Sequence, residues 1–187
     1  MAHFSAGDPR GQQPRRSGWR LGGLALTLLV ANAAQAGDLA PTSELPLSEL
    51  AVQAVRAGGN SASVHQAGSE NTITVNQHGS NRASSAQEGM HGTVRVSQHG
   101  ADNVVSARQY GWNNDTAVNQ QGFDNEIHVV QGGAHNRNEI DQVGRGNRAH
   151  VGQYGVGNLA VIQQYGSSQV ASVQQYGNGD FAKVIQH

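Results

Sequence analysis

The sequence contains no cysteine, few aromatic residues and few charged residues. Without cysteine no disulfide bond can hold the fold together, although this does not locate the protein in any compartment. Aromatic residues make up 5% of the 187 residues, which argues against an ordinary thick core of large apolar side chains. The length fits one domain, or at most two. A polar chain with 25 glycines could also be disordered, so composition alone does not predict a fold.

The sequence also lacks an excess of basic residues. It has 12 Lys and Arg against 13 Asp and Glu, and the part beyond residue 36 keeps 8 basic and 12 acidic residues. This mildly acidic balance without a basic patch argues against nucleic acid as a partner.

Residues 1–36 have the pattern of an export signal peptide. A basic segment with four arginines precedes the apolar residues 21–31, and an A-x-A site at residues 34–36 predicts cleavage before Gly37. The apolar run is too short to span a membrane, so we expect no transmembrane segment in the mature chain. The Arg15–Arg16 pair, in a poor context, leaves the twin-arginine route as an alternative.

Residues 37–54 form a lead-in segment before the regular part of the chain. Pro41 and Pro46 favour an extended conformation there, whereas a short helical turn could begin near Ser48. The sequence leaves both conformations open.

The regular part is a short repeat over residues 55–187. Glutamine recurs every eleven residues, with one step of ten: Gln66, Gln77, Gln87, Gln98, Gln109, Gln120, Gln131, Gln142, Gln153, Gln164, Gln175 and Gln186. A glycine follows two positions later: Gly68, Gly79, Gly89, Gly100, Gly111, Gly122, Gly133, Gly144, Gly155, Gly166 and Gly177. An asparagine precedes most glutamines by six positions: Asn60, Asn71, Asn103, Asn114, Asn125, Asn136, Asn147 and Asn158. Such a fixed period indicates a stacked array, because a disordered chain does not keep its residues in phase.

Each unit predicts one strand and one turn. In the unit QAGSENTITVNQ, alternate positions hold Asn71, Ile73, Val75 and Gln77, which predicts a strand with one buried face. Gly79 then supplies a turn, since glycine adopts positive φ without strain. We therefore expect about seven residues of strand and about four of turn in each unit.

A single strand cannot bury its own face, so two units should form one flat coil of about 22 residues. Twelve units then give an all-β solenoid of about six stacked coils. Because glutamine and asparagine share the apolar face, we expect them inside, where identical amides stack about 4.8 Å apart and hydrogen-bond to one another.

Several units depart from the pattern. The step from Gln77 to Gln87 lacks one residue, which we place in the turn, and Asn138 puts an amide where a small apolar residue is usual. Three other residues stand at the asparagine position: Gly92, Gln169 and Asp180.

Other functions find little support in the sequence. His78, His99, His128 and His150 lack the compact spacing of a metal site, and no set of residues suggests catalysis, so we expect no metal, no cofactor and no enzymatic activity. The four tyrosines each follow a repeated glutamine, and we expect them to stack along the edges.

Three other kinds of solenoid have sequence signatures that differ from this repeat. An ice- or glycan-binding solenoid would repeat an outward threonine array, but Thr72 and Thr74 have no counterparts in later units. The carboxylate pairs Asp124–Glu126 and Glu139–Asp141 suit solubility better than a hydrolase site, and the calcium-binding G-G-x-G-x-D repeat is absent.

The unit from Gln142 to Gln153, QVGRGNRAHVGQ, resembles the curlin repeat of curli fibre subunits. The resemblance covers residues 55–187 and implies a secreted bacterial subunit that polymerises into surface amyloid in the biofilm matrix. It further implies self-association, a related curli subunit as partner, and export through the curli secretion pore with its accessory proteins. In that family the Asn, Gln and alternating apolar positions face the interior of a β-solenoid.

The family has a major fibre subunit and a minor, nucleating one. Residues 37–54 are not glycine-rich, which resembles the minor type, whereas the regular last unit from Gln175 to Gln186 fits the major type better. We favour the nucleating subunit and keep the major subunit as the alternative.

Two expectations concern assembly. Since only His187 follows Gln186, we expect no cap at that end, and we expect both terminal coils to be bare and to stack on further subunits. Between Arg148 and Asp180 there is no charged residue, which predicts that residues 153–175 are the most aggregation-prone part of the chain.

Overall fold

A computed structural model describes residues 25–31, 51–57 and 59–187, and its regular secondary structure over these residues is entirely β-strand. The expected all-β solenoid is therefore confirmed. The strands are β1 (Ala25–Ala31), β2 (Ala51–Ala57), β3 (Asn60–Ser69), β4 (Thr72–Met90), β5 (Thr93–Trp112), β6 (Asp115–Phe123), β7 (Glu126–Ala134), β8 (Arg137–Arg145), β9 (Arg148–Val156), β10 (Leu159–Ser167), β11 (Val170–Asn178) and β12 (Phe181–Gln186).

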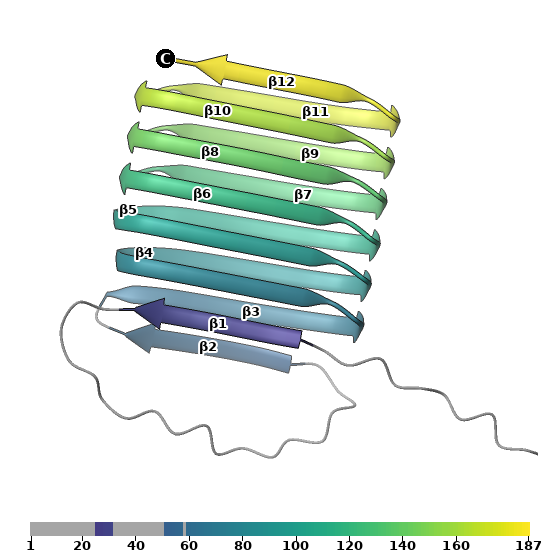
Figure 1. Cartoon of the computed structure of the whole chain (residues 1–187), viewed down its shortest axis with the longest axis horizontal. Helices are drawn as coiled ribbons and strands as arrows, with labels where there is room; N and C mark the ends of the chain where they lie inside the picture. The colour runs from purple at the N-terminus through teal and green to yellow at the C-terminus, as the bar shows by residue number, and fades with distance from the viewer. Residues whose placement is uncertain (1–24, 32–50, 58) are drawn as a thin grey trace, which may run out of the picture.

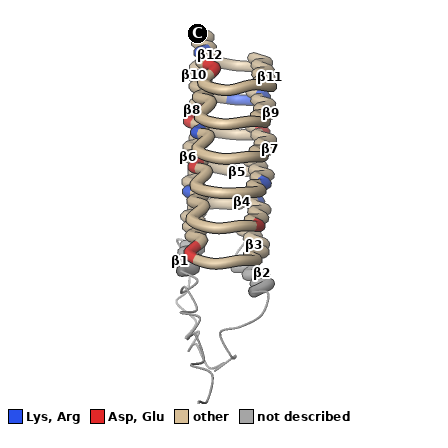
Figure 2. Tube along the Cα trace, turned by 90° about the vertical axis from the view of Figure 1, so that its right-hand side faces the viewer, with Lys and Arg blue, Asp and Glu red and all other residues tan. Residues whose placement is uncertain are grey.

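From β3 onward the chain winds as a flat coil with two parallel faces (Figure 1). One face, called the β11 face, contains β3, the second halves of β4 and β5, and then β7, β9 and β11. The other, called the β12 face, contains the first halves of β4 and β5, and then β6, β8, β10 and β12. Each face has six layers, so these residues make six coils. Seen edge-on, the coil is narrow and long (Figure 2).

The register repeats every 22 residues, as two eleven-residue units require. Gln98 pairs with Gln120, and Gln109 with Gln131. Because of the ten-residue step, paired residues in the first layers are 21 residues apart instead of 22, as Gln66 and Gln87 are. The β4–β5 pairing shifts between Ser80 and Arg82, which places the missing residue at a corner of the coil, as predicted.

The expected lengths of strand and turn were wrong. Strands β6 to β11 have 9 residues each, and β4 and β5 run through a corner with 19 and 20 residues. The reason lies in the glycine corners: Gly100 pairs with Gly79 and Gly122, so backbone pairing continues where a turn was expected.

The interior is thin and built from small side chains. Alternate residues along each strand point inward, and most of the apolar ones are Ala or Val, with Ile73, Ile127, Ile140 and Ile162 the largest. The Lys, Arg, Asp and Glu residues of the described coils, coloured in Figure 2, are all exposed or half-buried, so none of them belongs to the interior. Small inward residues let the two faces approach closely, which leaves space for the amides but not for a thick core.

The N-terminal end of the solenoid is covered, which corrects the expectation of two bare ends. β1 pairs in parallel with the first half of β4, and β2 pairs antiparallel with β3, setting Ala51 opposite Gln66. An unpaired strand edge readily recruits another strand, and nearby segments of the chain supply it here. The first face expected within residues 55–187, beginning at Asn60, corresponds to β3.

The opposite end is open within the residues that the structure describes. β11 pairs with β9 and β12 with β10, and no described strand pairs with their outer edges. Of the expected signal peptide, residues 25–31 form β1; the remainder and residues 37–50 of the lead-in lie outside the described residues. No helix in the described segments has the length and apolar character needed to cross a membrane.

Candidate functional site

Two rows of glutamine side chains run through the interior along the solenoid axis. In each row, the Nε2 of one glutamine donates to the Oε1 of the glutamine one coil further on, over 2.6–3.0 Å. On the β11 face the row is Gln66, Gln87, Gln109, Gln131, Gln153 and Gln175. On the β12 face it is Gln77, Gln98, Gln120, Gln142, Gln164 and Gln186. All ten bonds point the same way, from the N-terminal toward the C-terminal end.

The second Nε2 hydrogen of most of these amides crosses the interior to a backbone carbonyl. Gln131 donates to the Asp115 carbonyl over 3.2 Å, and Gln98 donates to that of Arg82 over 3.2 Å. Such an amide therefore ties its own strand to the next coil and to the opposite face. Buried amides that satisfy both hydrogens fix the register of the coils, since a shifted coil would leave them without partners.

The asparagine side chains form hydrogen bonds within each corner and between the corners of successive coils. The Oδ1 of Asn103 accepts the backbone N–H of Asn125 over 3.2 Å. The Nδ2 of Asn125 donates to the Gln121 carbonyl within its own corner and to the Gly144 carbonyl one coil on, over 3.4 and 3.0 Å. The three substituted positions keep only part of this pattern. Gly92, Gln169 and Asp180 each donate a backbone N–H to the preceding asparagine.

The corner glycines allow the coils to stack closely. Ten of the eleven adopt φ between 106° and 139°, a region that favours glycine, and only Gly177 does not. A Cβ added at Gly122 would collide with the carbonyl oxygen of Gly144 in the next coil. Glycine is thus required here for both backbone conformation and space.

Two residues that the sequence reasoning left out of the rows belong to them. Asn81 lies six residues before Gln87, as Asn71 does before Gln77, and it donates to the Gly100 carbonyl over 3.2 Å; the spacing could have identified it. The buried Thr116 hydroxyl accepts from Gln109 over 3.0 Å and donates to Gln131 over 2.8 Å. No spacing signal marks Thr116, because it stands where other units have an apolar residue.

Outward side chains also form short stacks. The rings of Tyr154 and Tyr176 are 5.4 Å apart and nearly parallel, as expected for tyrosines at an edge. Tyr165 instead stacks on His187 and donates to Asp141 over 2.8 Å, and this hydrogen bond raises the pKa of its phenol. Tyr110 lies opposite Gly132 in the next coil, so the row is interrupted there.

The histidines form two stacked pairs on the surface. His78 lies over His99 and His128 over His150, with ring centroids 4.8 and 5.2 Å apart. Partial burial and then the neighbouring His150 lower the pKa of His128. Three or more metal-ligating side chains do not come together anywhere among the described residues.

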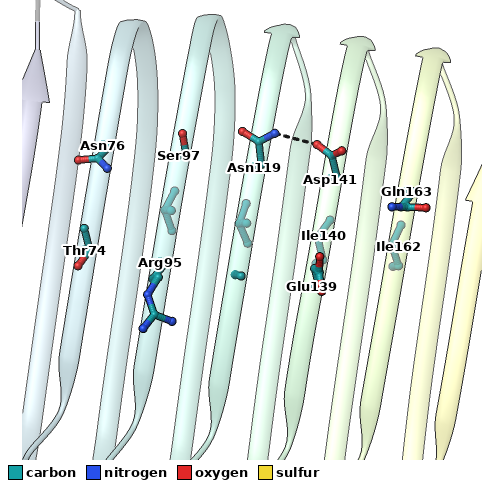
Figure 3. A pocket seen from close by; sticks show the side chains of 13 residues that line it. Thr74, Asn76, Arg95, Ser97, Asn119, Glu139, Ile140, Asp141, Ile162 and Gln163 are labelled. Atoms are coloured by element: carbon teal, nitrogen blue, oxygen red, sulfur yellow. Dashed lines mark hydrogen bonds between the residues drawn. The ribbon is translucent and has the colours of Figure 1, made fainter.

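A groove of about 470 Å³ with both polar and apolar lining residues runs along the β12 face (Figure 3). It exists because the small Ala117 lies between the longer side chains of Arg95 and Glu139. Asn119 donates to Asp141 across it over 2.8 Å. The expected solubility charges Glu139 and Asp141 line this groove.

Some buried polar atoms have no partner among the described residues. Three of them lie at the ends of the rows: the Oε1 atoms of Gln66, Gln77 and Gln169. Two residues inside the stack, Ser85 and Asn138, also hold such atoms. For Asn138, the amide that stands where a small apolar residue is usual, both side-chain polar atoms are buried and unpaired.

A family model of the curlin associated repeat matches residues 56–79, 122–155 and 133–166. The matched segments contain six of the row glutamines: Gln66, Gln77, Gln131, Gln142, Gln153 and Gln164. No curated protein matches the sequence significantly.

Proposed function

Because the chain belongs to the curlin-repeat family, we propose that it is a structural subunit of extracellular curli fibres, which grow by stacking coils along the solenoid axis. The observation that carries this proposal is the continuity of the two glutamine rows through all six coils up to an open strand edge at β11 and β12. An open edge of parallel strands with buried amides in register is a template for another coil.

The surface charges are arranged in a way that suits end-to-end growth. Opposite charges from successive coils lie close together, as with Glu126 and Arg148 at 3.4 Å and Arg95 and Asp115 at 3.2 Å. These exposed pairs add little stability. They occur in the middle of the stack, whereas residues 149–179 contain no Lys, Arg, Asp or Glu and the last strand, β12, contains only Lys183, so another coil approaches the C-terminal end against little repulsion.

We further propose that the subunit is exported to the cell surface, where it acts as the minor, nucleating subunit in biofilm and adhesion, with the major subunit as the alternative. Residues 37–54 support the nucleating role, because they lack the glycine-rich segment that the resemblance associates with the major type. The expected partners are a related curli subunit, the secretion pore and its accessory proteins. The role is structural, without catalysis or cofactor.

Polymerisation of the mature chain, residues 37–187, tests the proposal. A fibre subunit gives dye-binding fibres with cross-β reflections near 4.8 and about 10 Å. A stable monomer that binds a polysaccharide would instead support a soluble binding module and overturn the proposal.

Seeding separates the two subunit types. Trace amounts of a nucleator shorten the lag of a related curlin-repeat subunit many-fold. A major subunit polymerises readily alone and accelerates the other chain no more than preformed fibres do.

A further inference from the structure

We propose that the edge formed by β3 and the first half of β4 is a docking site for the C-terminal coil of a second copy, bound head to tail, and that β2 is the strand this copy displaces. The inference rests on the proposed fibre function and adds to it a fixed polarity of assembly and a segment that gates it.

The unpaired amide atoms at the two ends are complementary. At the N-terminal end, the Oε1 atoms of Gln66 and Gln77 are buried and lack a donor. At the C-terminal end, Gln175 and Gln186 each donate one Nε2 hydrogen to a backbone carbonyl, of Leu159 and Val170 respectively. Every earlier glutamine of the rows donates its second hydrogen to the next coil, but for Gln175 and Gln186 this hydrogen has no acceptor among the described residues. One end therefore offers two acceptors and the other offers two donors.

This complementarity fixes the orientation of the second copy. Because all ten glutamine bonds point toward the C-terminal end, two N-terminal ends brought together would set acceptor against acceptor. Two C-terminal ends would set donor against donor. Only a head-to-tail junction lets both rows continue without a break.

The asparagine rows support the same orientation. In these rows an amide oxygen accepts the backbone N–H of the following coil, as Asn147 does from Gln169 over 3.0 Å. The oxygen of Gln169 itself is buried and has no donor. A coil placed beyond β11 in the same direction supplies that N–H.

The number of coils allows the junction without a shift in phase. The parallel stack begins with β3 on the β11 face and finishes with β12 on the β12 face, so it contains whole coils only. In a head-to-tail pair, β3 of the second copy continues the layer after β11, and the first half of its β4 continues the layer after β12. Gln66 then follows Gln175, and Gln77 follows Gln186.

β2 occupies this docking edge without completing it. It is the one described strand that pairs antiparallel, and its register sets Ala51, a residue with no amide, opposite Gln66. β2 thus satisfies backbone groups of β3 but leaves the glutamine oxygen unpaired. The C-terminal coil of a second copy satisfies both, so it replaces β2. β1 covers β4 in a similar way and belongs to the segment expected to be cleaved.

Disulfide trapping tests the orientation, since the chain has no cysteine of its own. Ser63 and Ser172 are exposed and occupy the same outward row on the first and last strands of the β11 face. Two single variants of the mature chain, S63C and S172C, are polymerised separately and as a mixture, and then oxidised. Adjacent in-register strands bring the Cα atoms to a separation that a disulfide spans.

We expect covalent dimers in the mixture and not in either variant alone. A matched control replaces S63C by S84C, whose neighbours in the row, Ser63 and Ser106, come from its own chain. That mixture should give no dimers. Fibres of S63C alone that cross-link, or a mixture that forms fibres without dimers, would overturn the head-to-tail junction.

A second variant tests the gate. Ala54 and Ser63 are register partners between β2 and β3, so the double variant A54C/S63C locks β2 in place when oxidised. We expect elongation onto preformed seeds to slow at least tenfold in the oxidised protein and to recover on reduction of the same sample. Equal rates in both states would show that β2 is not displaced.

The outcomes separate this inference from the function on which it rests. If the unsubstituted mature chain forms no fibres, the proposed function is wrong. If fibres form but the cross-links or the locked variant contradict the predictions above, the function stands and the polarity or the gate is wrong.

Discussion

Replacing Gln131 by leucine removes an amide from the middle of an interior row while keeping much of its bulk. Gln131 is fully buried, accepts from Gln109 over 2.7 Å and donates to Gln153 over 3.0 Å. It also accepts the Thr116 hydroxyl over 2.8 Å. The substitution leaves the Oε1 of Gln153 without its donor and the Thr116 hydroxyl without its acceptor.

These lost partners set the size of the effect. An unsatisfied buried group costs about 1–3 kcal/mol, so two of them cost roughly 2–6 kcal/mol. A buried leucine returns up to about 3 kcal/mol of hydrophobic stabilisation. Taking about 4 kcal/mol for the two lost partners and about 2–3 kcal/mol for the leucine, we expect the free energy of unfolding to fall by about 1–2 kcal/mol per subunit.

The assay is guanidinium-induced dissociation of fibres, compared between Q131L and two controls. Q121L makes the same chemical change at an exposed position of β6, and H128L changes an outward residue of β7, the strand that also holds Gln131. Both controls should stay within about 0.5 kcal/mol of the parent, as surface substitutions usually do. Equal losses for Q131L and Q121L would refute the assignment of inward and outward positions.

Three further predictions concern other parts of the coil. In Gly122→Ala, the added Cβ clashes with the next coil at a position with φ +122°, so the free energy of unfolding measured by chemical denaturation should fall by more than about 2 kcal/mol. Gly157 has φ +71° and open space around it, so Gly157→Ala should lower the free energy of unfolding by only about 1 kcal/mol. The lowered pKa of His128 means that its neutral form stabilises the fold above pH 6.5. Fibre stability measured by denaturation should therefore decrease as the pH falls below this value, and His128→Gln should flatten the decrease. Val173→Asp, in the uncharged segment, should lengthen the polymerisation lag more than Val129→Asp; the reverse order would contradict the idea that this segment governs the lag.

The repeat was predictable because its spacing encodes the geometry directly. Alternation from Asn71 to Gln77 gave the inward face, and the eleven-residue step gave the 22-residue register. The missing residue before Gln87 was also placed at its corner, because the positions on either side kept their phase.

Two features could not be predicted from spacing. Gly100 was expected in a turn, yet its positive φ lets pairing continue through the corner, because identical corners stack on both sides. The antiparallel pairing of β2 depends on competition for an open edge, which leaves no periodic signal in residues 51–57.

The six whole coils formed by residues 60–186 also define a length. At about 4.8 Å per layer, a fibre of head-to-tail copies would have an axial repeat of about 29 Å per subunit. Any outward side chain that occurs once in the mature sequence, such as Trp112, would then recur at this interval along one side of the fibre. The polymer would thus be a one-dimensional lattice whose period is set by the backbone, and chemical groups attached at an outward position would be displayed at regular spacing.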